Sequence, residues 1–390
     1  MTSITLKKNE DRRIITGHQW IFSNEIHTIN GNPKKGDVVE ILRSDGKKLG
    51  IGFYNPHSLI AVRFLSKEVE EINTQFFEQR IRSALELRKK MFSESTTYRV
   101  IHSESDFLPG LIIDRYNNIF SIQTFSAGMD LRISLICDAI ESIFSPQGIV
   151  ERNESPLRLL EQLPQQKNIV RGTIEPTIIT LEGIQFRVDV LEGQKTGLFL
   201  DQRKNRIAIE PYVKNATVLD CFCNEGGFGL YAAYFGAKSV TCVDISEYAL
   251  QQAKYNAELN HCKNIAFEKA DVFSFLKKNI EEKKKFDVVI LDPPSFTKSK
   301  KNLHTALKGY KELHHDALQL LSDDGIIVST SCSHHVDEKM FLELINSSAQ
   351  KVGKKLRILH NNGASPDHPV IPSMPETRYL KFVIGNLDHD

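Results

Sequence analysis

The fold class of this chain depends on the stretch Val218-Leu219-Asp220-Cys221-Phe222-Cys223-Asn224-Glu225-Gly226-Gly227-Phe228-Gly229. The pattern predicts a buried strand, a tight glycine turn and a helix from Leu230 to Phe235. Asp220 closes the strand, and the glycines let a ligand approach the backbone closely. Open α/β sheets bind ligands outside the carboxyl ends of their strands, so the stretch predicts a nucleotide-like ligand at this edge.

The turn differs from the dinucleotide-binding pattern GxGxxG, because Phe222 and Asn224 stand where glycines would be expected. The next expected strand ends at Asp244, where a carboxylate can accept hydrogen bonds from both hydroxyls of a ribose. A third strand leads to Asp271, which we expect to accept a hydrogen bond from an adenine amino group. The alternative is that Asp244 and Asp271 cap the helices that follow them.

Strand and helix patterns alternate from Thr217 onward. This alternation predicts an α/β architecture, a mostly parallel sheet with helices on both faces. Ser246 is the expected cap of the second helix. The expected strands are 217–221, 239–244, 265–268, 286–291, 325–331, 355–360 and 379–384. The expected helices are 227–236, 247–260, 272–279, 303–321 and 337–351.

Two further strand ends carry residues suited to catalysis. The run Asp292-Pro293-Pro294-Ser295-Phe296 must leave the sheet, because two prolines cannot continue a central strand. In Ser329-Thr330-Ser331-Cys332-Ser333, small polar residues surround one thiol at the end of an apolar strand. We expect Cys332 to be a nucleophile, helped electrostatically by His334 or His335; the alternative is a buried, inert thiol.

The composition indicates an ordinary globular protein. The 390 residues suggest two or three domains at about 150 residues each. A net charge of +1 excludes a strongly basic nucleic-acid coat, though not a local basic face. No apolar run approaches the length of a membrane span, and the N-terminus lacks the core of a signal peptide. The cysteines contain no zinc-type pair, so we expect reduced thiols, no metal and a cytoplasmic location.

The first residues predict a small β domain. Residues 1–70 show short strand patterns punctuated by glycines, with Trp20 in the expected core of a barrel and lysines in its turns. The alternative for these lysines is a face that contacts phosphates. Residues 71–175 predict an α+β domain with helices at 72–94 and 130–144.

A hairpin and a glycine-containing segment lead into the alternating region. Residues 176–192 predict the hairpin, turning at Glu182-Gly183. Asp201 is the expected cap of a helix that runs to Tyr212.

Several motifs together resemble the RlmI-like family of 23S rRNA cytosine-5 methyltransferases, and the resemblance covers nearly the whole chain. Asp220 to Phe228 is similar to the first motif of class I S-adenosylmethionine-dependent methyltransferases. Asp292 to Phe296 and Thr330 to Ser333 resemble the catalytic loops of the RlmI-like family. Similar segments are also found at Gly17 to Phe22, Glu104 to Arg115, Gly193 to Arg203 and Glu376 to Lys381.

The resemblance implies a PUA domain at 1–70, a central α+β domain at 71–175, a hairpin connector at 176–192 and a Rossmann-like methyltransferase domain at 193–390. It also implies a homodimer that uses S-adenosylmethionine and acts on 23S rRNA or a large-subunit precursor. The implied cofactor-binding residues are Phe199, Asp201, Arg203, Asp220, Phe222, Asn224, Gly226, Gly227, Phe228, Asp244, Ile245, Ser246, Asp271, Val272, Asp292 and Pro293. The implied substrate-binding residues are Lys195, Pro294, Phe296, Lys300 and Tyr310.

The resemblance also implies a mechanism. Cys332 adds to carbon 6 of a cytosine, carbon 5 takes the methyl group, and a general base then removes the carbon-5 proton while Asp292 hydrogen-bonds the ring. Many related RNA enzymes have a second cysteine where this chain has Ser295, so the general base stays unassigned. Two alternatives remain open: a class I enzyme that methylates a purine nitrogen, with Phe296 stacked on the base, and a non-catalytic RNA-binding assembly factor.

Overall fold

The computed structural model describes residues 2–193, 196–297 and 300–388, with only the backbone at Lys300. Contacts divide the chain into two compact units. The first unit comprises Met1–Ile179, Val188–Leu200 and Pro366–Thr377, and the second comprises Thr180–Arg187, Asp201–Ser365 and Arg378–Asp390. Each unit has hydrophobic clusters of its own. The four domain boundaries expected from the sequence stay a prediction.

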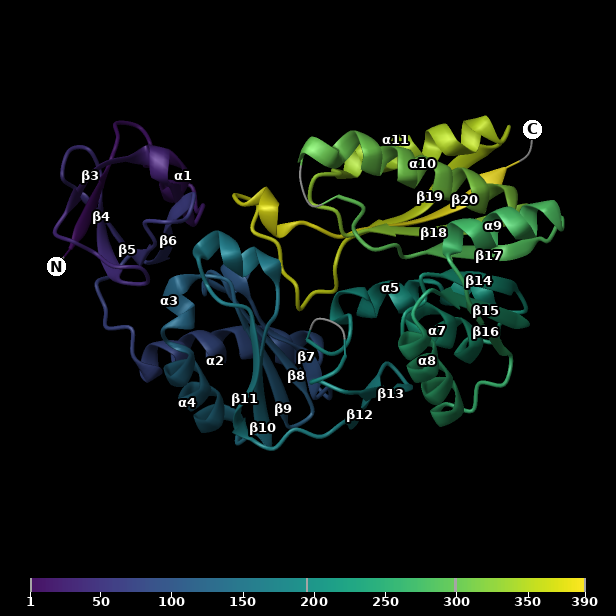
Figure 1. Ribbon diagram of the computed structural model, residues 1–390, viewed down its shortest axis with the longest axis horizontal. Helices are drawn as coiled ribbons and strands as arrows, with labels where there is room; N and C mark the ends of the chain where they lie inside the picture. Colours follow the sequence, from purple (N-terminus) through teal and green to yellow (C-terminus); the bar gives the residue numbers. More distant parts are fainter. Residues whose placement is uncertain (1, 194–195, 298–299, 389–390) are drawn as a thin grey trace. The chain divides into compact units, whose positions relative to one another are not determined.

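The N-terminal part of the first unit is a six-stranded sheet, drawn in purple in Figure 1, with the strand order β2-β6-β5-β4-β1-β3. β1 and β4 pair in parallel, and the other neighbours pair antiparallel. Its core includes Ile4, Ile21, Val39 and Val62. The elements are β1 (Ser3–Leu6), α1 (Arg12–Ile15), β2 (Trp20–Phe22), β3 (Ile26–Asn30), β4 (Val38–Leu42), β5 (Lys48–Tyr54) and β6 (Ile60–Ser66).

Trp20 lies outside that core, so the expectation that it belongs to the core of the N-terminal β domain is wrong. Its indole N–H donates to Oε1 of Glu104 at 2.8 Å, in the central part of the same unit. Arg63 reaches the same carboxylate at 3.0 Å and the carboxylate of Glu161 at 3.1 Å. An indole joins an apolar ring to a polar N–H, which suits a boundary between two packed parts.

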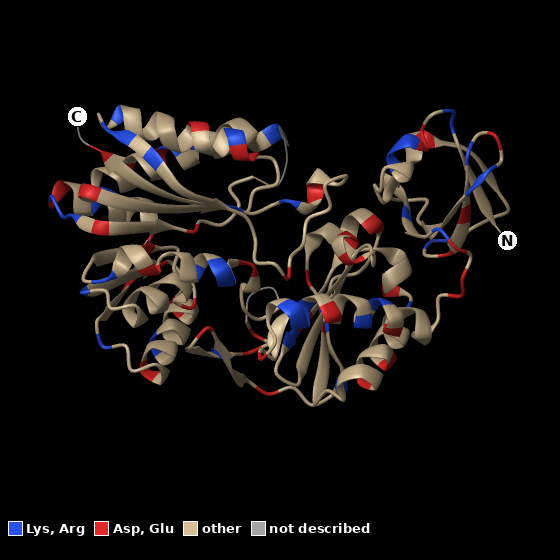
Figure 2. Cartoon of the chain, turned by 180° about the vertical axis from the view of Figure 1, so that it is seen from behind, with Lys and Arg blue, Asp and Glu red and all other residues tan. Residues whose placement is uncertain are grey.

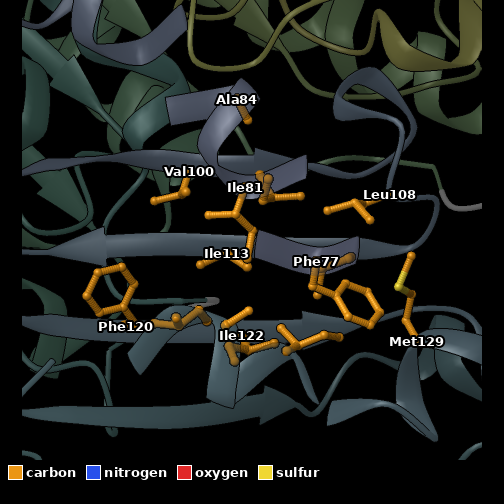
Figure 3. Packing of buried hydrophobic residues seen from close by; sticks show 14 of the residues in the cluster. Phe77, Ile81, Ala84, Val100, Leu108, Ile113, Phe120, Ile122 and Met129 are labelled. Atoms are coloured by element: carbon orange, nitrogen blue, oxygen red, sulfur yellow. The ribbon is translucent and has the colours of Figure 1, made fainter. Parts of the chain in front are cut away.

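The central part of the first unit is a five-stranded sheet in the order β11-β10-β9-β8-β7, packed against α2 and α4. Figure 3 shows side chains of α2 facing side chains of the strands, with Phe77 and Ile81 directed toward Ile113 and Ile122. Asn73 caps α2 by accepting the N–H of Phe76. The elements are α2 (Thr74–Met91), β7 (Thr97–His102), β8 (Leu111–Tyr116), β9 (Ile119–Thr124), α3 (Ala127–Asp130), α4 (Ile133–Phe144), β10 (Gly148–Asn153) and β11 (Gln166–Gly172).

Two expectations for this part need correction. The single helix expected at 130–144 is split into α3 and α4, because Arg132 leaves helical geometry (φ −112°) and donates to the carbonyls of Gly36 and Gly128. The edge strand β11 was not expected. Its residues are mostly exposed and polar, so they lack the alternation that marks a half-buried strand.

The hairpin expected at 176–192 is confirmed as β12 (Thr177–Leu181) and β13 (Ile184–Val188). Glu182 (φ 46°) and Gly183 (φ 88°) both adopt the left-handed conformation, which a two-residue hairpin turn of this kind requires.

The second unit is built on a seven-stranded sheet in the order β16-β15-β14-β17-β18-β20-β19. The first five strands in this order run parallel. β20 runs antiparallel to them, and β19, which pairs antiparallel with β20, runs in their direction again. Helices lie on both faces, with α7 and α8 on one and α9, α10 and α11 on the other (Figure 1). The strands are β14 (Thr217–Cys221), β15 (Ser239–Asp244), β16 (Ile265–Lys269), β17 (Phe286–Leu291), β18 (Leu321–Ser331), β19 (Lys355–Asn362) and β20 (Lys381–Asp388). The helices are α5 (Arg203–Ala208), α6 (Glu210–Val213), α7 (Gly227–Tyr234), α8 (Glu247–Leu259), α9 (Val272–Glu281), α10 (Leu303–Gln319) and α11 (Glu338–Lys351).

The α/β architecture expected from Thr217 onward is therefore confirmed, and the expected elements differ from the observed ones mainly at their ends. The short 3-10 helices of the described residues are η1 (Ser23–Glu25), η2 (Ser103–Asp106), η3 (Pro156–Glu161), η4 (Leu200–Gln202), η5 (Lys300–Asn302) and η6 (Pro375–Thr377).

The expected helix from Asp201 to Tyr212 is wrong in two respects. Its cap position is Gln202, while the carboxylate of Asp201 accepts the Tyr379 hydroxyl at 2.6 Å. The helix is also interrupted between α5 and α6, because Pro211 has no N–H to continue the hydrogen-bond ladder.

The distribution of charged side chains agrees with the net charge of +1. Figure 2 shows Lys and Arg dispersed among Asp and Glu along the elements. Lys35, in the turn before β4, already donates to the carbonyl of Gln162, and Lys48 of β5 pairs with Glu40. A phosphate-contacting face in the N-terminal part stays a prediction. None of the helices in the described ranges combines the length and the apolar character that crossing a bilayer requires.

The substitution Phe77→Ala should destabilise the first unit, because Phe77 is fully buried between α2 and the central sheet. We expect a loss of about 3–5 kcal/mol in the free energy of unfolding, measured by chemical denaturation. The control Gln79→Ala, on the exposed side of α2, should change it by less than about 0.5 kcal/mol. Equal effects of the two substitutions would contradict this packing.

Candidate functional site at the carboxyl edge of the second sheet

The strand order reverses between β14 and β17, since the chain builds outward from β14 to β15 and β16 and then crosses back to β17 and β18. Ligands of open α/β sheets bind at such a reversal, outside the carboxyl ends of the strands. Asp220 is the fourth residue of β14 and Asp292 directly follows β17. The register pairs Cys221 with Leu291 and Leu291 with Ser329, so Asp292 stands level with Thr330.

Asp220 is completely buried at this reversal. Its Oδ2 accepts the N–H of Gly229 at 2.8 Å, which joins the end of β14 to the first turn of α7. Its Oδ1 is buried without a hydrogen-bond partner among the described residues. Burial raises the pKa of Asp220 to about 8, and the nearby carboxylates of Asp292 and Asp244 act in the same direction. Such a group can accept a hydrogen bond or a positive charge from a ligand.

The turn after β14 keeps the geometry of a glycine turn with two non-glycine residues. Phe222 (φ 62°) and Asn224 (φ 48°) adopt the left-handed conformation, which costs a bulky residue about 1–2 kcal/mol. Gly226 is also left-handed (φ 84°) and precedes α7. Strain of this kind persists where the surrounding structure requires it, often at functional sites. Phe228 is buried and stacks on Phe382, so its side chain supports the turn from behind.

Asp244 ends β15 as expected, and the hypothesis that it caps the next helix is wrong. The cap of α8 is Ser246, whose hydroxyl accepts the N–H of Ala249. Asp244 instead accepts the N–H of Asn224 through Oδ2 and that of Ser246 through Oδ1, both at 2.9 Å. The next residue, Ile245, is 68% exposed. This exposed apolar side chain beside a carboxylate suits the adenosine part of a nucleotide-like ligand.

For Asp271 the capping alternative is confirmed, because Oδ1 accepts the N–H and hydroxyl of Ser274 at the start of α9. Val272 is buried in the sheet core, so a ligand can approach its backbone only. An adenine contact by these two residues stays a prediction.

The run from Asp292 leaves the sheet at the end of β17 as expected. Oδ1 of Asp292 accepts the side-chain amide of Gln202 at 3.0 Å and the hydroxyl of Thr330. Pro293 is buried and Pro294 is exposed. The carboxylate is thus held in one orientation by two donors from different elements.

Cys332 follows the last residue of β18 and is partly exposed, so the alternative of a fully buried thiol is wrong. A chain of buried hydroxyls adjoins it. The Oγ of Ser295 lies 2.9 Å from that of Ser333, which lies 2.9 Å from the Tyr310 hydroxyl, itself 3.0 Å from the Oγ of Ser331. This chain fixes the backbone on both sides of Cys332.

Tyr310 and Phe296, both expected to contact the substrate, pack against other side chains of the protein. Tyr310 is completely buried, and burial raises its pKa, so its hydroxyl stays protonated. Phe296 packs on Tyr310 with ring centroids 4.5 Å apart and on Phe273 at 6.2 Å. A substrate contact by Tyr310 would act through the loop that it orders.

The segment before α5 was expected to border the cofactor. Arg203 donates to Glu182 at 2.9 Å, and Phe199 belongs by its contacts to the first unit. Lys195 lies outside the described residues, and so does the side chain of Lys300. Their roles stay predictions. Within the described ranges, no three or more His, Cys, Asp or Glu side chains are arranged to hold a metal ion.

Sequence reasoning did not select Gln202, Thr330 or Ser333, although the structure places them in contact with Asp292 or beside Cys332. Each of the three lies within two residues of a predicted site residue. The signal that could have identified them is a polar side chain next to a predicted site residue.

Two family models match the chain. A PUA-like domain matches residues 4–67, and a methyltransferase domain matches residues 213–363.

Two curated relatives match nearly the full length. A protein of Vibrio vulnificus strain YJ016 named ribosomal RNA large subunit methyltransferase I is 38% identical over 97% of this chain and 98% of its own. A protein of the same name from Tolumonas auensis is 37% identical over 98% of each chain.

Among solved structures, a protein from Streptococcus mutans described as a SAM-dependent methyltransferase covers 99% of this chain and 100% of its own, with a TM-score of 0.84 at 22% identity. A structure described as a methyltransferase complexed with SAH gives a TM-score of 0.86 at 22% identity over the same shares. At this identity the likeness concerns the fold alone.

Gly229→Ala should disturb the junction of β14 and α7, because a Cβ atom there would lie 2.3 Å from Sγ of Cys242. We expect a loss of about 1–3 kcal/mol in the free energy of unfolding of the second unit. Adding Cys242→Ala removes the clashing sulfur and should restore most of that loss. Gly363→Ala, where the nearest atom is 3.6 Å away, is the matched control. No rescue by Cys242→Ala would show that the clash is not the cause.

Proposed function

Because the chain belongs to the ribosomal RNA large subunit methyltransferase I family, we propose that it methylates large-subunit rRNA with S-adenosylmethionine as methyl donor. The finer proposal is transfer to carbon 5 of a cytosine in 23S rRNA, through an adduct between Cys332 and carbon 6. The observation that carries it is the position of Cys332 one residue beyond β18 and two residues after Thr330, whose hydroxyl donates to the carboxylate of Asp292.

The residues at the reversal of the sheet fit the cofactor. S-adenosylmethionine supplies an electrophilic methyl group on a positively charged sulfonium. The buried Oδ1 of Asp220 is a polar atom with no partner in the described protein, so a cationic ligand would satisfy it. Asp244 would accept the ribose hydroxyls beside exposed Ile245, and the left-handed turn at Gly226 allows close approach of the ligand to the backbone.

Cysteine at position 332 suits the poor reactivity of cytosine carbon 5. A thiolate that adds to carbon 6 makes carbon 5 enamine-like and therefore nucleophilic. Asp292 would hydrogen-bond the ring, held for this by Gln202 and Thr330. The cytosine must leave its base stack before Cys332 can reach it.

Removal of the carbon-5 proton needs a general base, which stays unassigned. Ser295 occupies the place of the second cysteine found in many related RNA enzymes. Its hydroxyl donates to the carbonyl of Thr297 and lies 2.9 Å from Ser333, within the buried hydroxyl chain. A serine hydroxyl held in this way supports the loop at Cys332.

The rest of the chain is proposed to bring RNA to this site. The PUA-like match at residues 4–67 supports an RNA-binding role for the expected PUA domain at 1–70. The homodimer, the cytoplasmic location and the divisions at 71–175, 176–192 and 193–390 are parts of the same proposal.

Cys332→Ala should abolish methylation of large-subunit rRNA, with turnover lower by about three orders of magnitude or more. Wild-type protein should form a denaturant-stable complex with RNA that carries 5-fluorocytosine, because fluorine blocks loss of the carbon-5 substituent, and Cys332→Ala should not. The control Cys262→Ala changes another partly exposed thiol and should act like wild type.

The product identifies the reaction. Mass spectrometry of digested rRNA should find 5-methylcytosine. Full turnover by Cys332→Ala together with a methylated purine would replace the cytosine mechanism by amino or ring-nitrogen methylation, and binding of RNA without any binding of S-adenosylmethionine would indicate a non-catalytic assembly factor.

Binding of S-adenosylmethionine should release about one proton near pH 7 and weaken about tenfold per pH unit as the pH falls below 8. The reason is that Asp220, with a pKa raised to about 8, is mostly neutral at pH 7, whereas a cationic ligand favours its ionised form. Above pH 8 the affinity should level off, because Asp220 is then already ionised. Calorimetry in two buffers of different ionisation enthalpy measures the released proton. Asp220→Asn should remove this component, and an equal proton release by both proteins would contradict the assignment.

A further inference from the structure

We propose that Lys381 activates the thiol of Cys332 by accepting its proton and then holding an ammonium beside the thiolate. The inference rests on the proposed function, since it concerns the nucleophile of that reaction, and it adds a residue that neither the family models nor the cytosine mechanism assigns. Lys381 acts through Cys332, so it is a positioning residue.

The pairing of two strands brings Lys381 to the residues on either side of Cys332. β20 runs antiparallel to β18, and Lys381 is paired with Ser331, the residue before Cys332. Its Nζ donates to the carbonyl of Ser333, the residue after Cys332, at 2.7 Å. It also donates to the backbone carbonyl of Tyr379 at 2.7 Å. The ammonium is therefore anchored to the loop that carries the thiol.

The surroundings of Lys381 leave its charge poorly compensated. The residue is 5% exposed, and within the described part of the chain no carboxylate lies at ion-pair distance from Nζ. Burial lowers its pKa to about 8, Arg378 acts in the same direction, and Cys332 is the strongest influence that raises it, ahead of Asp337. The same attraction favours the thiolate of Cys332 by linkage.

Two histidines of this region, His334 and His314, are poor substitutes for Lys381. Burial, followed by Lys381 and His335, lowers the pKa of His334, so its ring is neutral at physiological pH. His314 is buried between the Tyr310 carbonyl and Ser329, and burial lowers its pKa to about 4. His334 is therefore a poor source of positive charge for the thiolate, while the expected help from His335 stays a prediction. In the proposal, Lys381 supplies this charge.

The proton balance closes within the pair. The S–H proton of Cys332 moves to the neutral amine of Lys381. The freed electron pair of sulfur forms the bond to carbon 6 of the cytosine, and the electron pair of the carbon 5–carbon 6 double bond then forms the bond to the methyl group. When the general base takes the carbon-5 proton, the pair of that C–H bond re-forms the double bond, and the sulfur–carbon bond breaks with its electron pair returning to sulfur. The thiolate again faces the ammonium, and no outside proton donor is needed for its release.

The test measures alkylation of Cys332 by iodoacetamide against pH, followed by mass spectrometry of the Cys332 peptide in the full-length protein without RNA. In Lys381→Met, the midpoint of the alkylation profile should move up by about one pH unit or more, with a rate near pH 7 about tenfold lower. Lys381→Arg keeps a cation and should stay close to wild type.

Lys285→Met is the matched control. Its Nζ also donates to two backbone carbonyls, those of Gln319 and Leu321, but Leu321 lies at the other end of β18 from Cys332. We expect no change of the alkylation profile. A purely structural role of Lys381 would make Met and Arg substitutions alike, because both lose the present hydrogen-bond geometry.

An unchanged midpoint in Lys381→Met that retains the wild-type unfolding midpoint would overturn the proposal, and so would an equal shift in Lys381→Arg. Should Lys381→Met fail to fold, Lys381→Arg decides, since a profile shifted upward despite the retained cation rules out the charge effect. Product analysis of methylated rRNA is carried out in parallel. A shifted alkylation profile with a purine product would overturn the proposed function while leaving the thiol activation intact.

Discussion

The hydrogen bond from the Gly229 N–H to the buried carboxylate of Asp220 is the constraint on which the second unit depends. It joins the end of β14 to the start of α7, so the chain between them must turn within a few residues. Phe222 and Asn224 accept the left-handed conformation to make that turn, and Asp244 holds it from the next strand by accepting the Asn224 N–H. The turn is therefore rigid before any ligand arrives, and a rigid site loses less entropy on binding.

The reversal of strand order then decides which side chains meet. Because β17 lies directly beside β14, Asp292 emerges next to the turn, and because β18 follows β17, Thr330 reaches the same carboxylate. Cys332 comes two residues later. The proposed cofactor site and the proposed nucleophile thus lie at one edge of the sheet for a reason of topology. Neighbouring parallel strands end at the same edge, where open α/β sheets bind their ligands.

The sequence predicted the strand-end residues because they are local features. Asp220, Asp244 and Asp292 each close an apolar run, and Asp-Pro-Pro cannot continue a strand, so no distant partner had to be known. Asp201 was misjudged as a helix cap because its partner, Tyr379, is far along the chain. Lys381 is not recognisable from the sequence as a site residue for the same reason. Its place opposite Ser331, the residue before Cys332, follows from the antiparallel pairing of β20 with β18, and no local sequence pattern predicts that pairing. For Tyr310 the sequence suggested a substrate contact, whereas its ring is buried in the core. The burial of an aromatic side chain cannot be recognised from its residue type alone.

Buried charges in the two units differ in how they are compensated, and this difference separates scaffold from site. In the first unit, Arg88 makes two hydrogen bonds of 2.6 Å to Asp106. Burial alone would raise the pKa of Asp367, but the neighbouring His368 outweighs it, and the pKa is lowered to about 2. These paired groups hold elements together. At the carboxyl edge of the second unit, Asp220 and Lys381 are buried with partial compensation, and burial moves the pKa of each to about 8 from opposite sides. A buried charge without full compensation costs stability. Two such groups at one edge of the sheet are best explained by a chemical role at that edge. In the proposed reaction, Asp220 releases a proton when a cationic ligand binds, and Lys381 accepts one from the thiol of Cys332.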